Sequence, residues 1–545
     1  MKNKNASTSL YSEGRGGLAV APHAQAAESA AAVLSEGGNA IEACIAMAAT
    51  LSAVYPHMTG LGGDSFWLLH QPGQPVQSIL ACGRSAASVN RQQYVDAGFR
   101  NIPYRGGHAA ITVAGTVSGW DMALGISASD WDGRMPLKRL LSDALDYCRD
   151  GYTVTASQAH ATASRFEQLA TQPGFASVYL SDGQAPEAGD TLTQPALADT
   201  LEHLARVGLD DFYRGDLADA IAADLSRMDS PLNRGDLAAH SATFAEPLRL
   251  RRSDVEIFTT AAPTQGAATL MILGQFARRP TGVASTEDVD MVHWLVEATK
   301  QAFAVRNREV RDPHLMSVHA QALLDDDRLD AMAAGIDGRH AATWGAASGP
   351  ADTTWFGAID AKGRAVSCIQ SIYHEFGSGL VLPLTGLCWQ NRGASFSLQA
   401  GHPLELQPNT LPFHTLCPSL ALFDDGRRMV FGTMGGDGQP QTQAILFTRY
   451  ADYGQALAQA ISAPRWVLGR TWGDHSDNLK LESRFDPALI EALRQRGHDL
   501  VLLDDYDETV GHAGAIVRHP DGRIEGASDP RSDGAAMAAD SGDGA

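Results

Sequence analysis

Hydrophobic positions in the first part of the chain predict two helices and a strand. Residues 24–36 are rich in alanine and stop at Gly37-Gly38, a pair that favours the end of a helix. Residues 40–54 follow Asn39, a good N-cap, and are apolar on nearly every face. Because a helix without a polar face is stable only inside a protein, we expect residues 40–54 to lie in a large core. A strand-like run follows at residues 65–70.

The pattern then becomes helical over a long stretch before it loses its periodicity. Residues 110–335 are predicted to be largely helical, with amphipathic segments such as residues 289–305. Residues 334–352 are dominated by Gly, Ala, Ser, Pro and Asp and show no period. This composition is typical of a flexible linker between two parts of a protein.

Three β-hairpins are predicted after the linker. Each consists of two strand-like runs joined by a short turn that contains glycine and charged residues, and they cover residues 354–372, 420–433 and 515–527. Three helices, predicted at residues 441–450, 453–462 and 487–496, can cover the faces of the resulting antiparallel sheet. Helices beside such a sheet indicate a layered α/β sandwich. The composition of residues 532–545 predicts disorder at the end of the chain.

Composition and charge exclude several classes of function. The chain has 545 residues, of which 44% are hydrophobic and 19% charged, which is typical of a compact globular enzyme. Its 63 acidic and 42 basic residues give a net charge of −21, so we expect no binding to nucleic acid or to anionic membrane surfaces. We find no membrane-spanning segment and no secretory signal. The six cysteines lack metal-ligand spacing and predict buried thiols in a cytoplasmic protein.

A glycine-rich segment resembles a phosphate-binding loop only superficially. Gly60, Gly62 and Gly63 have the wrong spacing, and here a helix precedes the glycines and a strand follows, which reverses the usual order. We therefore predict a tight turn, with His57 in a structural role that closes it. The acidic run 325–327 has no histidine or further acid at ligand spacing and predicts a solvated helix end. The sequence thus predicts no metal site.

The candidate for chemistry is the junction Asp352-Thr353-Thr354, where the linker meets the first hairpin. If the bond before Thr353 breaks, this residue gains a free α-amine beside its own hydroxyl. An α-amine has a pKa of ~7.7–8, so near neutral pH it is partly free base and can accept the hydroxyl proton. The same hydroxyl can first attack the carbonyl of Asp352 if the linker allows a strained conformation. From the residues alone, a threonine that simply begins a strand is the more common explanation.

Beyond these patterns, the chain resembles the γ-glutamyltranspeptidase family of N-terminal-nucleophile hydrolases over nearly its whole length. Several separated blocks occur in the family's order: Gly37-Gly38-Asn39-Ala40, Pro56-His57, Gly60-Leu61-Gly62-Gly63, Thr353-Thr354-Trp355-Phe356, Phe376-Gly377-Ser378-Gly379, Gly435-Gly436, and Gly526 to Arg531. The resemblance implies an α/β (α+β) fold, namely a four-layer αββα sandwich. It also implies a precursor cut between Asp352 and Thr353 into a large subunit, residues 1–352, and a small subunit, residues 353–545, with no metal or organic cofactor.

The same resemblance assigns catalytic roles to four residues. Thr353 matches the nucleophile that processing exposes, and Ser371 matches a second hydroxyl residue that orients it. Gly435 and Gly436 match the glycine pair whose backbone N–H groups form the oxyanion hole. Two donors aimed at a developing oxyanion can contribute several kcal/mol to catalysis, and glycine lets the backbone approach closely.

The substrate pocket implied by the resemblance departs from the glutamyl-specific pattern. An acid that normally holds the substrate amine falls at Ser395, whereas a family glutamine becomes Arg392. Because a glutamyl group is a zwitterion that needs an anion near its amine, this pocket suits a carboxylate without an amine. Taken alone, Arg84 could equally be a salt-bridged surface residue and His414 a core histidine. The candidate substrate-binding residues are Arg84, Tyr373, Asn391, Arg392, His414 and Thr415.

These departures resemble the branch of the family that includes oxamate amidohydrolases. The expected activity is hydrolysis of the amide of a small, oxamate-like carboxylate through an acyl-enzyme. One alternative is γ-glutamyl hydrolysis or transfer on glutathione-like compounds, and another is cleavage of a cephalosporin side chain. A third alternative is an unprocessed, inactive relative that only binds a carboxylate. The implied partners are the small-molecule amide and the two subunits of one precursor.

Overall fold

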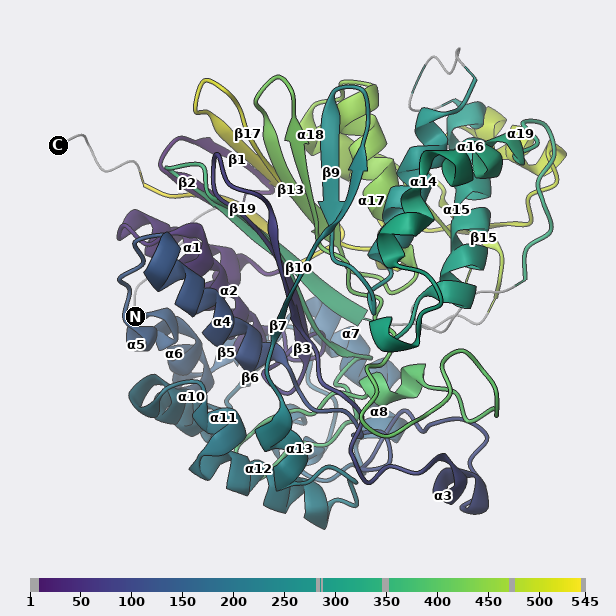
Figure 1. Ribbon diagram of the computed structural model, residues 1–545. Coiled ribbons are helices and arrows are strands. Elements are labelled where there is room, and N and C mark those ends of the chain that lie inside the picture. The colour runs from purple at the N-terminus through teal and green to yellow at the C-terminus, as the bar shows by residue number, and fades with distance from the viewer. Residues whose placement is uncertain (1–8, 281–284, 286–287, 346–351, 470–475, 541–545) are drawn as a thin grey trace.

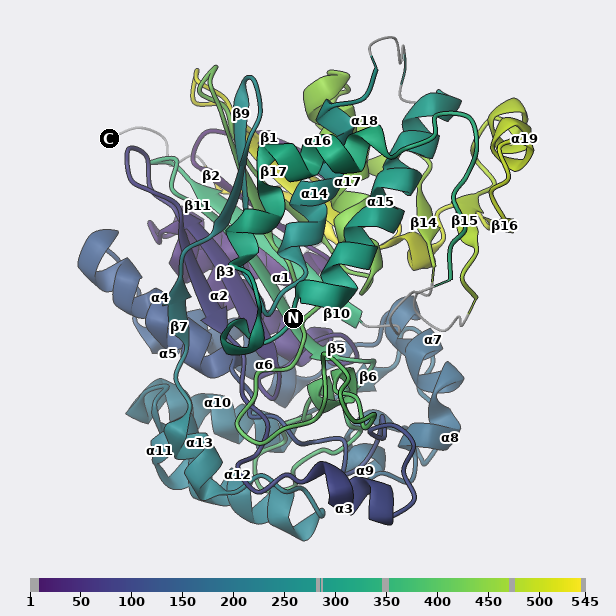
Figure 2. The same ribbon diagram turned by 45° about the vertical axis from the view of Figure 1, so that its right-hand side comes forward.

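Two stacked β-sheets between two layers of helices form the centre of the molecule (Figures 1 and 2). The computed structural model describes residues 9–280, 285, 288–345, 352–469 and 476–540. Both sheets have seven strands, and every strand pair within them is antiparallel. This arrangement confirms the predicted αββα sandwich.

The first sheet contains the predicted junction. In this sheet a strand from the beginning of the chain pairs with a strand from near its end. Its first hairpin, β10–β11, was predicted from the sequence pattern. In spatial order the strands are β19 (Ala535–Ala538), β2 (Gly17–Ala21), β10 (Asp352–Asp360), β11 (Ala365–Tyr373), β3 (Asp64–His70), β4 (Gln77–Ala81) and β7 (Thr243–Ala245).

The second sheet contains the other two predicted hairpins, β12–β13 and β17–β18, both confirmed. In spatial order its strands are β1 (Tyr11–Gly14), β18 (Ile524–Ser528), β17 (Ala513–Arg518), β13 (Arg428–Thr433), β12 (Ser419–Phe423), β9 (Val255–Thr259) and β8 (Leu248–Arg251). Two small sheets are added outside the sandwich: β14 (Trp466–Leu468), β15 (Leu479–Glu482) and β16 (Leu500–Leu503), and β5 (Tyr152–Thr153) with β6 (Thr191–Leu192).

Successive apolar side chains of the central strands point to opposite faces of each sheet, which explains why the two sheets stack. On β10, Trp355 and Ile359 pack into the core between the sheets, whereas Phe356 packs against the helices on the outer face. On β13, Val430 faces the other sheet, whereas Phe431 faces the second helical layer. Because successive side chains of a strand point to opposite faces, strands that are apolar at every position belong in a sheet covered on both sides.

The predicted central helix is α2 (Ala40–Val54), and all its residues are buried. Asn39 caps it, since the Asn39 side chain accepts the amides of Ile41 and Glu42 while the Glu42 side chain accepts the Asn39 amide. It packs with α1 (Ala24–Ser35) and α4 (Thr116–Asp130) against the first sheet. The remaining elements of this half are α3 (Arg91–Asp96), α5 (Leu137–Leu140), α6 (Ser142–Asp150), α7 (Ala156–Ser164), α8 (Phe166–Leu169), α9 (Phe175–Tyr179), α10 (Pro195–Val207), α11 (Asp211–Arg214), α12 (Asp216–Arg227) and α13 (Arg234–Ala239).

Figures 1 and 2 show α3 and α10–α13 gathered at one end of the sandwich, below the sheets in these views. The second sheet is covered by another set of helices, which includes α14 and α15 from the predicted helical region and α17 after the second hairpin. This set comprises α14 (Gly266–Ala277), α15 (Val289–Glu309), α16 (Asp326–Ala334), α17 (Gly438–Phe447), α18 (Leu457–Ser462) and α19 (Pro487–Gln495), with short helical turns at Pro313–Leu315, Ala320–Leu324, Arg392–Ser395, Thr448–Asp452 and Glu508–Val510.

The structure corrects three sequence predictions. The largely helical region 110–335 also contributes β7, β8 and β9, which are edge or near-edge strands of the two large sheets. The helix predicted at residues 453–462 starts only at Leu457, because a π-helical turn at Thr448–Asp452 separates it from α17. Residues 532–540 are not disordered: Ala535–Ala538 form β19, which pairs with β2, whereas residues 541–545 lie outside the described residues.

The predicted linker is partly ordered. Residues 335–345 are described, and the Ala341 amide donates to the Arg496 carbonyl over 2.7 Å. Trp344 packs near the Phe303 ring, with 6.1 Å between the ring centroids. The rest of the predicted linker, residues 346–351, lies outside the described residues. In the described part of the chain no helix is both long and apolar enough to cross a membrane, and all six cysteines are buried and unpaired.

Candidate active site

Thr353 is the second residue of β10 and lies opposite an irregularity in β11. Asp352 pairs with Tyr373 and Thr354 pairs with Gln370, so two residues of β11 face the single residue Thr353. Such a bulge bends the strand and changes the direction of the side chains beside it. The Thr353 side chain is 1% exposed. The predicted cleavage position therefore lies at a buried distortion of the sheet and not within a regular strand.

The hydroxyl of Thr353 has a partner that sequence reasoning missed. Gln439 Nε2 lies 3.2 Å from Thr353 Oγ1, and the Gln439 Oε1 atom accepts the amide of Cys417 over 3.2 Å. Because an amide nitrogen can only donate, this contact leaves the threonine proton for another acceptor. Gln439 lies in the first turn of α17, directly after the glycine pair. The closeness of Gln439 to the glycine pair in the sequence was the only signal that could have identified it as a site residue.

Ser371 is one of the two residues of β11 that face Thr353. Its Oγ atom accepts the amide of Tyr373 over 2.8 Å. Tyr373 has a φ of +83°, a conformation that costs a non-glycine residue free energy and that this hydrogen bond helps to hold. Gly63 packs against the same backbone: a Cβ atom at Gly63 would lie 2.2 Å from the Ser371 carbonyl oxygen. The glycine segment is therefore a close-packed turn, as predicted.

His57 is buried and contacts three neighbouring segments. Its carbonyl accepts the amide of Phe376 over 2.9 Å, and its Nε2 atom lies 3.0 Å from Ser157 Oγ. The ring packs edge-on against Tyr55. Burial holds the pKa of His57 well below its usual range, so the ring is neutral near pH 7.

Gly435 and Gly436 form a turn between β13 and α17. Their φ angles are +113° and +54°, which favour glycine. Their carbonyls accept the amides of Gly438 and Gln439 over 2.7 and 3.2 Å. Neither glycine amide is hydrogen-bonded to any acceptor among the residues described here. Two backbone N–H groups thus remain available in the loop that also carries the Gln439 side chain to Thr353.

A buried network, which sequence reasoning also missed, connects this turn to the predicted substrate pocket. Gln265 Nε2 donates to the carbonyls of both Gly436 and Thr415, over 2.8 and 2.7 Å. Gln265 Oε1 in turn accepts from Arg306 over 2.6 Å. Arg306 forms an ion pair of 2.8 Å with Asp437, and both side chains are 0% exposed. Because the network is buried and mutually bonded, it fixes the glycine turn relative to the pocket.

Arg392 is a buried cation among the predicted substrate-binding residues. It is 1% exposed, and its guanidinium lies 3.8 Å from the centre of the Tyr373 ring. Nη1 donates to Thr415 Oγ1 over 3.4 Å, whereas Nε and Nη2 have no hydrogen-bond partner among the described residues. Burial lowers the pKa of Arg392 to about 10, so the group stays charged at neutral pH. Buried N–H groups of a cation without acceptors are rare, and this pair is suited to an anionic ligand.

Asp64 is a second group that sequence reasoning did not assign to the site. Its Oδ1 atom accepts the amides of Gly83 and Gly115 over 3.2 and 3.0 Å. Its Oδ2 atom lies 3.6 Å from His414 Nε2. Burial raises the pKa of Asp64 to about 7, although the charge of Arg392 opposes the shift. Burial and the Arg392 charge hold the pKa of His414 well below its usual range, so His414 is a neutral donor or acceptor near pH 7.

Two predicted pocket residues have other partners in the structure. Arg84 donates to Asp312 over 2.9 Å and to the Asn409 carbonyl over 2.8 Å, and its side chain is 42% exposed. Asn391 uses its side-chain oxygen to accept the His374 amide and its nitrogen to donate to the Tyr104 carbonyl. The structure brings together Tyr373, Arg392, His414 and Thr415, but Arg84 lies in a partly exposed ion pair and Asn391 ties two backbone segments together.

The acidic run 325–327 is the beginning of a helix, as predicted. Asp325 is the N-cap of α16, and Asp326 pairs with Arg278. A different group, His293, Glu297 and His498, has the composition of a metal site, and sequence reasoning missed it because His498 is distant in the chain from α15.

Comparisons with known proteins identify the family of this chain. The family model for γ-glutamyltranspeptidase matches residues 26–539. The oxamate amidohydrolase proenzyme of Klebsiella pneumoniae is 54% identical over 522 residues, which cover 95% of this chain and 98% of that protein. The glutathione hydrolase-like YwrD proenzyme of Bacillus subtilis is 38% identical over 521 residues, with 95% of this chain and 98% of that protein covered.

A solved structure extends the likeness to the fold. The crystal structure of a cephalosporin acylase from Bacillus halodurans aligns with a TM-score of 0.89 at 29% identity, and the alignment covers 97% of this chain and 96% of that one. The family model spans every predicted site residue, and each relative covers 95% of the chain. The chain therefore belongs to the γ-glutamyltranspeptidase family.

Proposed function

We propose that this enzyme cuts itself between Asp352 and Thr353 and then hydrolyses the amide of a small carboxylate that carries no amine, with oxamate as the model substrate. The observation that carries the substrate assignment is the Arg392 guanidinium, which is buried beside Tyr373 and Thr415 with two N–H groups unbonded to any described residue. A substrate carboxylate would satisfy both groups at once.

Self-cleavage begins with the Thr353 hydroxyl. Its oxygen attacks the Asp352 carbonyl carbon, the C–N bond to Thr353 breaks, and the nitrogen takes up the proton, which leaves an ester between the two residues. Water then hydrolyses this ester, which releases the Asp352 carboxyl group and restores the Thr353 hydroxyl beside the free α-amine. The bulge of β11 opposite Thr353 supports this step, because it interrupts the regular pairing of β10 at the residue that must reach the attacking geometry. The products are the large subunit, residues 1–352, and the small subunit, residues 353–545.

The second reaction uses the amine that the first one releases. The α-amine accepts the proton of the Thr353 hydroxyl, and the oxygen attacks the substrate amide carbon. Gly435 and Gly436 are proposed to donate their amides to the oxyanion, while Ser371 keeps the nucleophile in position. Ammonia leaves with the proton, and water hydrolyses the acyl-enzyme. For oxamate the products are oxalate and ammonia.

The pocket sets the proposed specificity. Arg392 pairs with the carboxylate, and Thr415 and His414 offer a hydroxyl and a neutral imidazole beside it. The family resemblance implies that Ser395 replaces the acid that holds a substrate amine. The name of the 54% identical relative, an oxamate amidohydrolase, supports the same substrate class. The unpaired cysteines support a reducing, cytoplasmic location.

One observation favours a second candidate function, hydrolysis of γ-glutamyl compounds. Asp64 is a buried carboxyl group near Arg392 and His414, and its Oδ2 atom lacks a hydrogen bond in the described structure. When ionised, Asp64 could hold the amine of a glutamyl group. The name of the 38% identical relative, glutathione hydrolase-like, points in the same direction.

A panel of amides separates the two candidates. The cleaved enzyme is incubated with oxamate, with a γ-glutamyl anilide and with a glutaryl amide that represents acylase substrates, and the release of ammonia or amine is followed. We expect kcat/KM for oxamate to exceed the other values by at least about 100-fold, since Ser395 replaces the acid with which the family holds the extra amine. A preference for the γ-glutamyl anilide would favour the second candidate, and turnover of the glutaryl amide alone would contradict both.

The shifted pKa of Asp64 predicts a change in the pH dependence of stability. Burial raises this pKa from 3.8 to about 7. Between these values the folded chain holds a proton that the unfolded chain releases, so this group lowers stability progressively as pH rises from ~4 to ~7. The variant Asp64→Asn has no such proton and can still accept the two backbone amides. We expect the difference in melting temperature, Asp64→Asn minus wild type, to be more positive at pH ~8 than at pH ~5.

Thermal unfolding at the two pH values tests this, with Asp325→Asn as the control. Asp325 is an exposed acid at the start of α16, and its removal is expected to leave the pH dependence unchanged. If the difference in melting temperature between Asp64→Asn and the wild type is the same at both pH values, Asp64 is ionised over this whole pH range and its pKa is not raised.

A further inference from the structure

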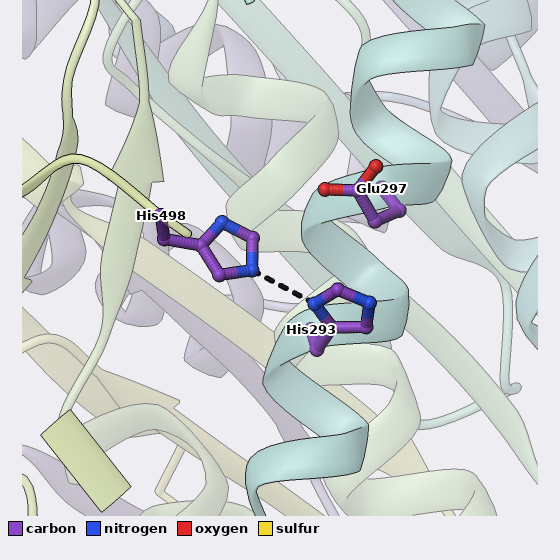
Figure 3. A group of neighbouring side chains, drawn as sticks. All are labelled: His293, Glu297 and His498. Carbon is purple, nitrogen blue, oxygen red and sulfur yellow. Dashed lines mark hydrogen bonds between the residues drawn. The ribbon is translucent and has the colours of Figure 1, made fainter. Parts of the chain in front are cut away.

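A second group of buried titratable side chains lies away from the candidate active site (Figure 3). His293 and Glu297 are four residues apart on α15, so they lie one above the other on the same face of the helix. His498 comes from the turn after α19. The exposed fractions of the three residues are 0%, 3% and 7%, and their ligand atoms all lie within 4.8 Å of one another.

The hydrogen bonds fix which nitrogen of each ring carries the proton. His293 Nε2 lies 2.8 Å from the Asp337 carbonyl, which can only accept, so Nε2 holds the proton and Nδ1 has the lone pair. His293 Nδ1 lies 2.8 Å from His498 Nε2, which therefore donates (Figure 3). One proton thus lies between the two rings. A ring that donates its far N–H to a backbone carbonyl is also the usual arrangement of a metal-binding histidine.

Glu297 provides an anionic oxygen next to this proton. Its Oε1 atom accepts from Lys300 Nζ over 2.6 Å, and its Oε2 atom accepts the Ala342 amide over 3.1 Å. Each carboxylate oxygen has a second lone pair, so these contacts leave the group able to bind a cation. Lys300 also donates to the Ala342 carbonyl over 2.6 Å, which keeps the ammonium directed toward the segment before the cleavage position.

We propose that His293, Glu297 and His498 bind one divalent transition-metal ion such as Zn²⁺, which replaces the proton between the two imidazoles. Two nitrogens and one carboxylate oxygen are the donor set that Zn²⁺, Co²⁺ and Ni²⁺ accept, whereas Mg²⁺ and Ca²⁺ prefer oxygen alone. A pocket of about 350 Å³ borders His498 and Lys300 on one side of the proposed site.

The proposed ion has a structural consequence, which rests on the proposed cleavage. His293 and Glu297 precede Thr353, whereas His498 follows it, so after processing the ion joins the large and the small subunit. Two of the ligands also bond the backbone of Asp337 and Ala342, which belong to the end of the large subunit. The metal ion therefore restrains this segment and holds the large and the small subunit together.

Metal binding is tested with Co²⁺, whose visible absorption reports a site of low coordination number. The wild type, freed of metal by a chelator that is then removed, is titrated with Co²⁺, and Zn²⁺ is added to displace it. We expect one equivalent to bind. His498→Gln can still donate to His293 but is a poor metal ligand, and it is expected to lower the affinity by at least about 100-fold, as is His293→Gln. His108→Gln, an exposed histidine elsewhere, is the control.

The same titration is made on the uncut variant Thr353→Ala, so that a failure of cleavage is distinguished from a failure of the metal site. We expect this variant to bind Co²⁺ as the wild type does. In the cleaved wild type, Zn²⁺ is also expected to raise the melting temperature, and it should have no such effect on His498→Gln. The absence of Co²⁺ absorption in the wild type, or unchanged binding in His498→Gln, would overturn the proposal.

Discussion

Thr353→Ala is expected to remain a single chain of 57.8 kDa on a denaturing gel and to lose at least about 10⁴-fold in amide hydrolysis. Both effects follow from one atom, because the same hydroxyl oxygen attacks the Asp352 carbonyl in the precursor and the substrate amide afterwards. Without it, no ester forms, and no free α-amine is released to act as the base. Gel analysis, N-terminal sequencing of the small fragment and ammonia release measure these effects together.

The neighbouring threonine provides the matched control for this experiment. Thr354 Oγ1 donates to the Gln370 carbonyl over 2.8 Å and is buried, so Thr354→Val removes a hydroxyl one residue away and keeps the shape. We expect Thr354→Val to cleave at the same bond and Thr353→Ser to retain part of both activities. The scheme fails if Thr353→Ala yields two fragments, or if an uncut wild-type chain hydrolyses amides at the full rate.

The parts of the site that the sequence predicted are those that local patterns encode. Thr353 could be found because a loss of periodicity is followed by an alternating strand, and Gly435-Gly436 because a glycine pair follows a strand. The resemblance to a known family supplied their roles. Arg392 could be found from the same comparison, since it replaces a residue of another type in the family's pocket.

The parts that the sequence did not predict depend on contacts between distant segments. Asp64 lies more than three hundred residues from Arg392 and His414 in the chain, and nothing around it indicates that β3 begins beside them. Gln265 and Arg306 act through one buried network with Asp437, which exists only after α14, α15 and the glycine turn have packed together. The ion pair of Arg84 has the same cause, because its partner Asp312 cannot be identified from spacing.

The errors in the fold have a similar cause. β7, β8 and β19 are short strands at or near the edges of the sheets, and pairing with a neighbouring strand stabilises them more than their own propensity does. β19 consists of Ala and Met in a segment whose composition favours disorder. It is ordered because β2 offers it a partner. The long central helix α2 was predictable because its uniform apolar pattern has only one stable location.

The substrate assignment makes its sharpest prediction at Arg392. If its two N–H groups pair with the substrate carboxylate, Arg392→Gln is expected to raise KM and lower kcat/KM for oxamate by roughly 30- to 1,000-fold, the effect of removing one partner of a buried charge pair. Arg392→Lys should recover little, because an ammonium cannot replace a planar donor pair. Inhibition by oxalate, which has the same carboxylate, should weaken in parallel.

Arg84→Gln is the matched variant, since the sequence predicted both arginines as ligands and the structure distinguishes them. Arg84 is partly exposed and already paired with Asp312, so its loss is expected to change kcat/KM for oxamate by less than about five-fold. Normal cleavage into two fragments shows that either variant has folded, which separates binding from stability. If Arg84→Gln loses oxamate hydrolysis while Arg392→Gln keeps it, the carboxylate is bound at the other arginine and the pocket proposed here is wrong.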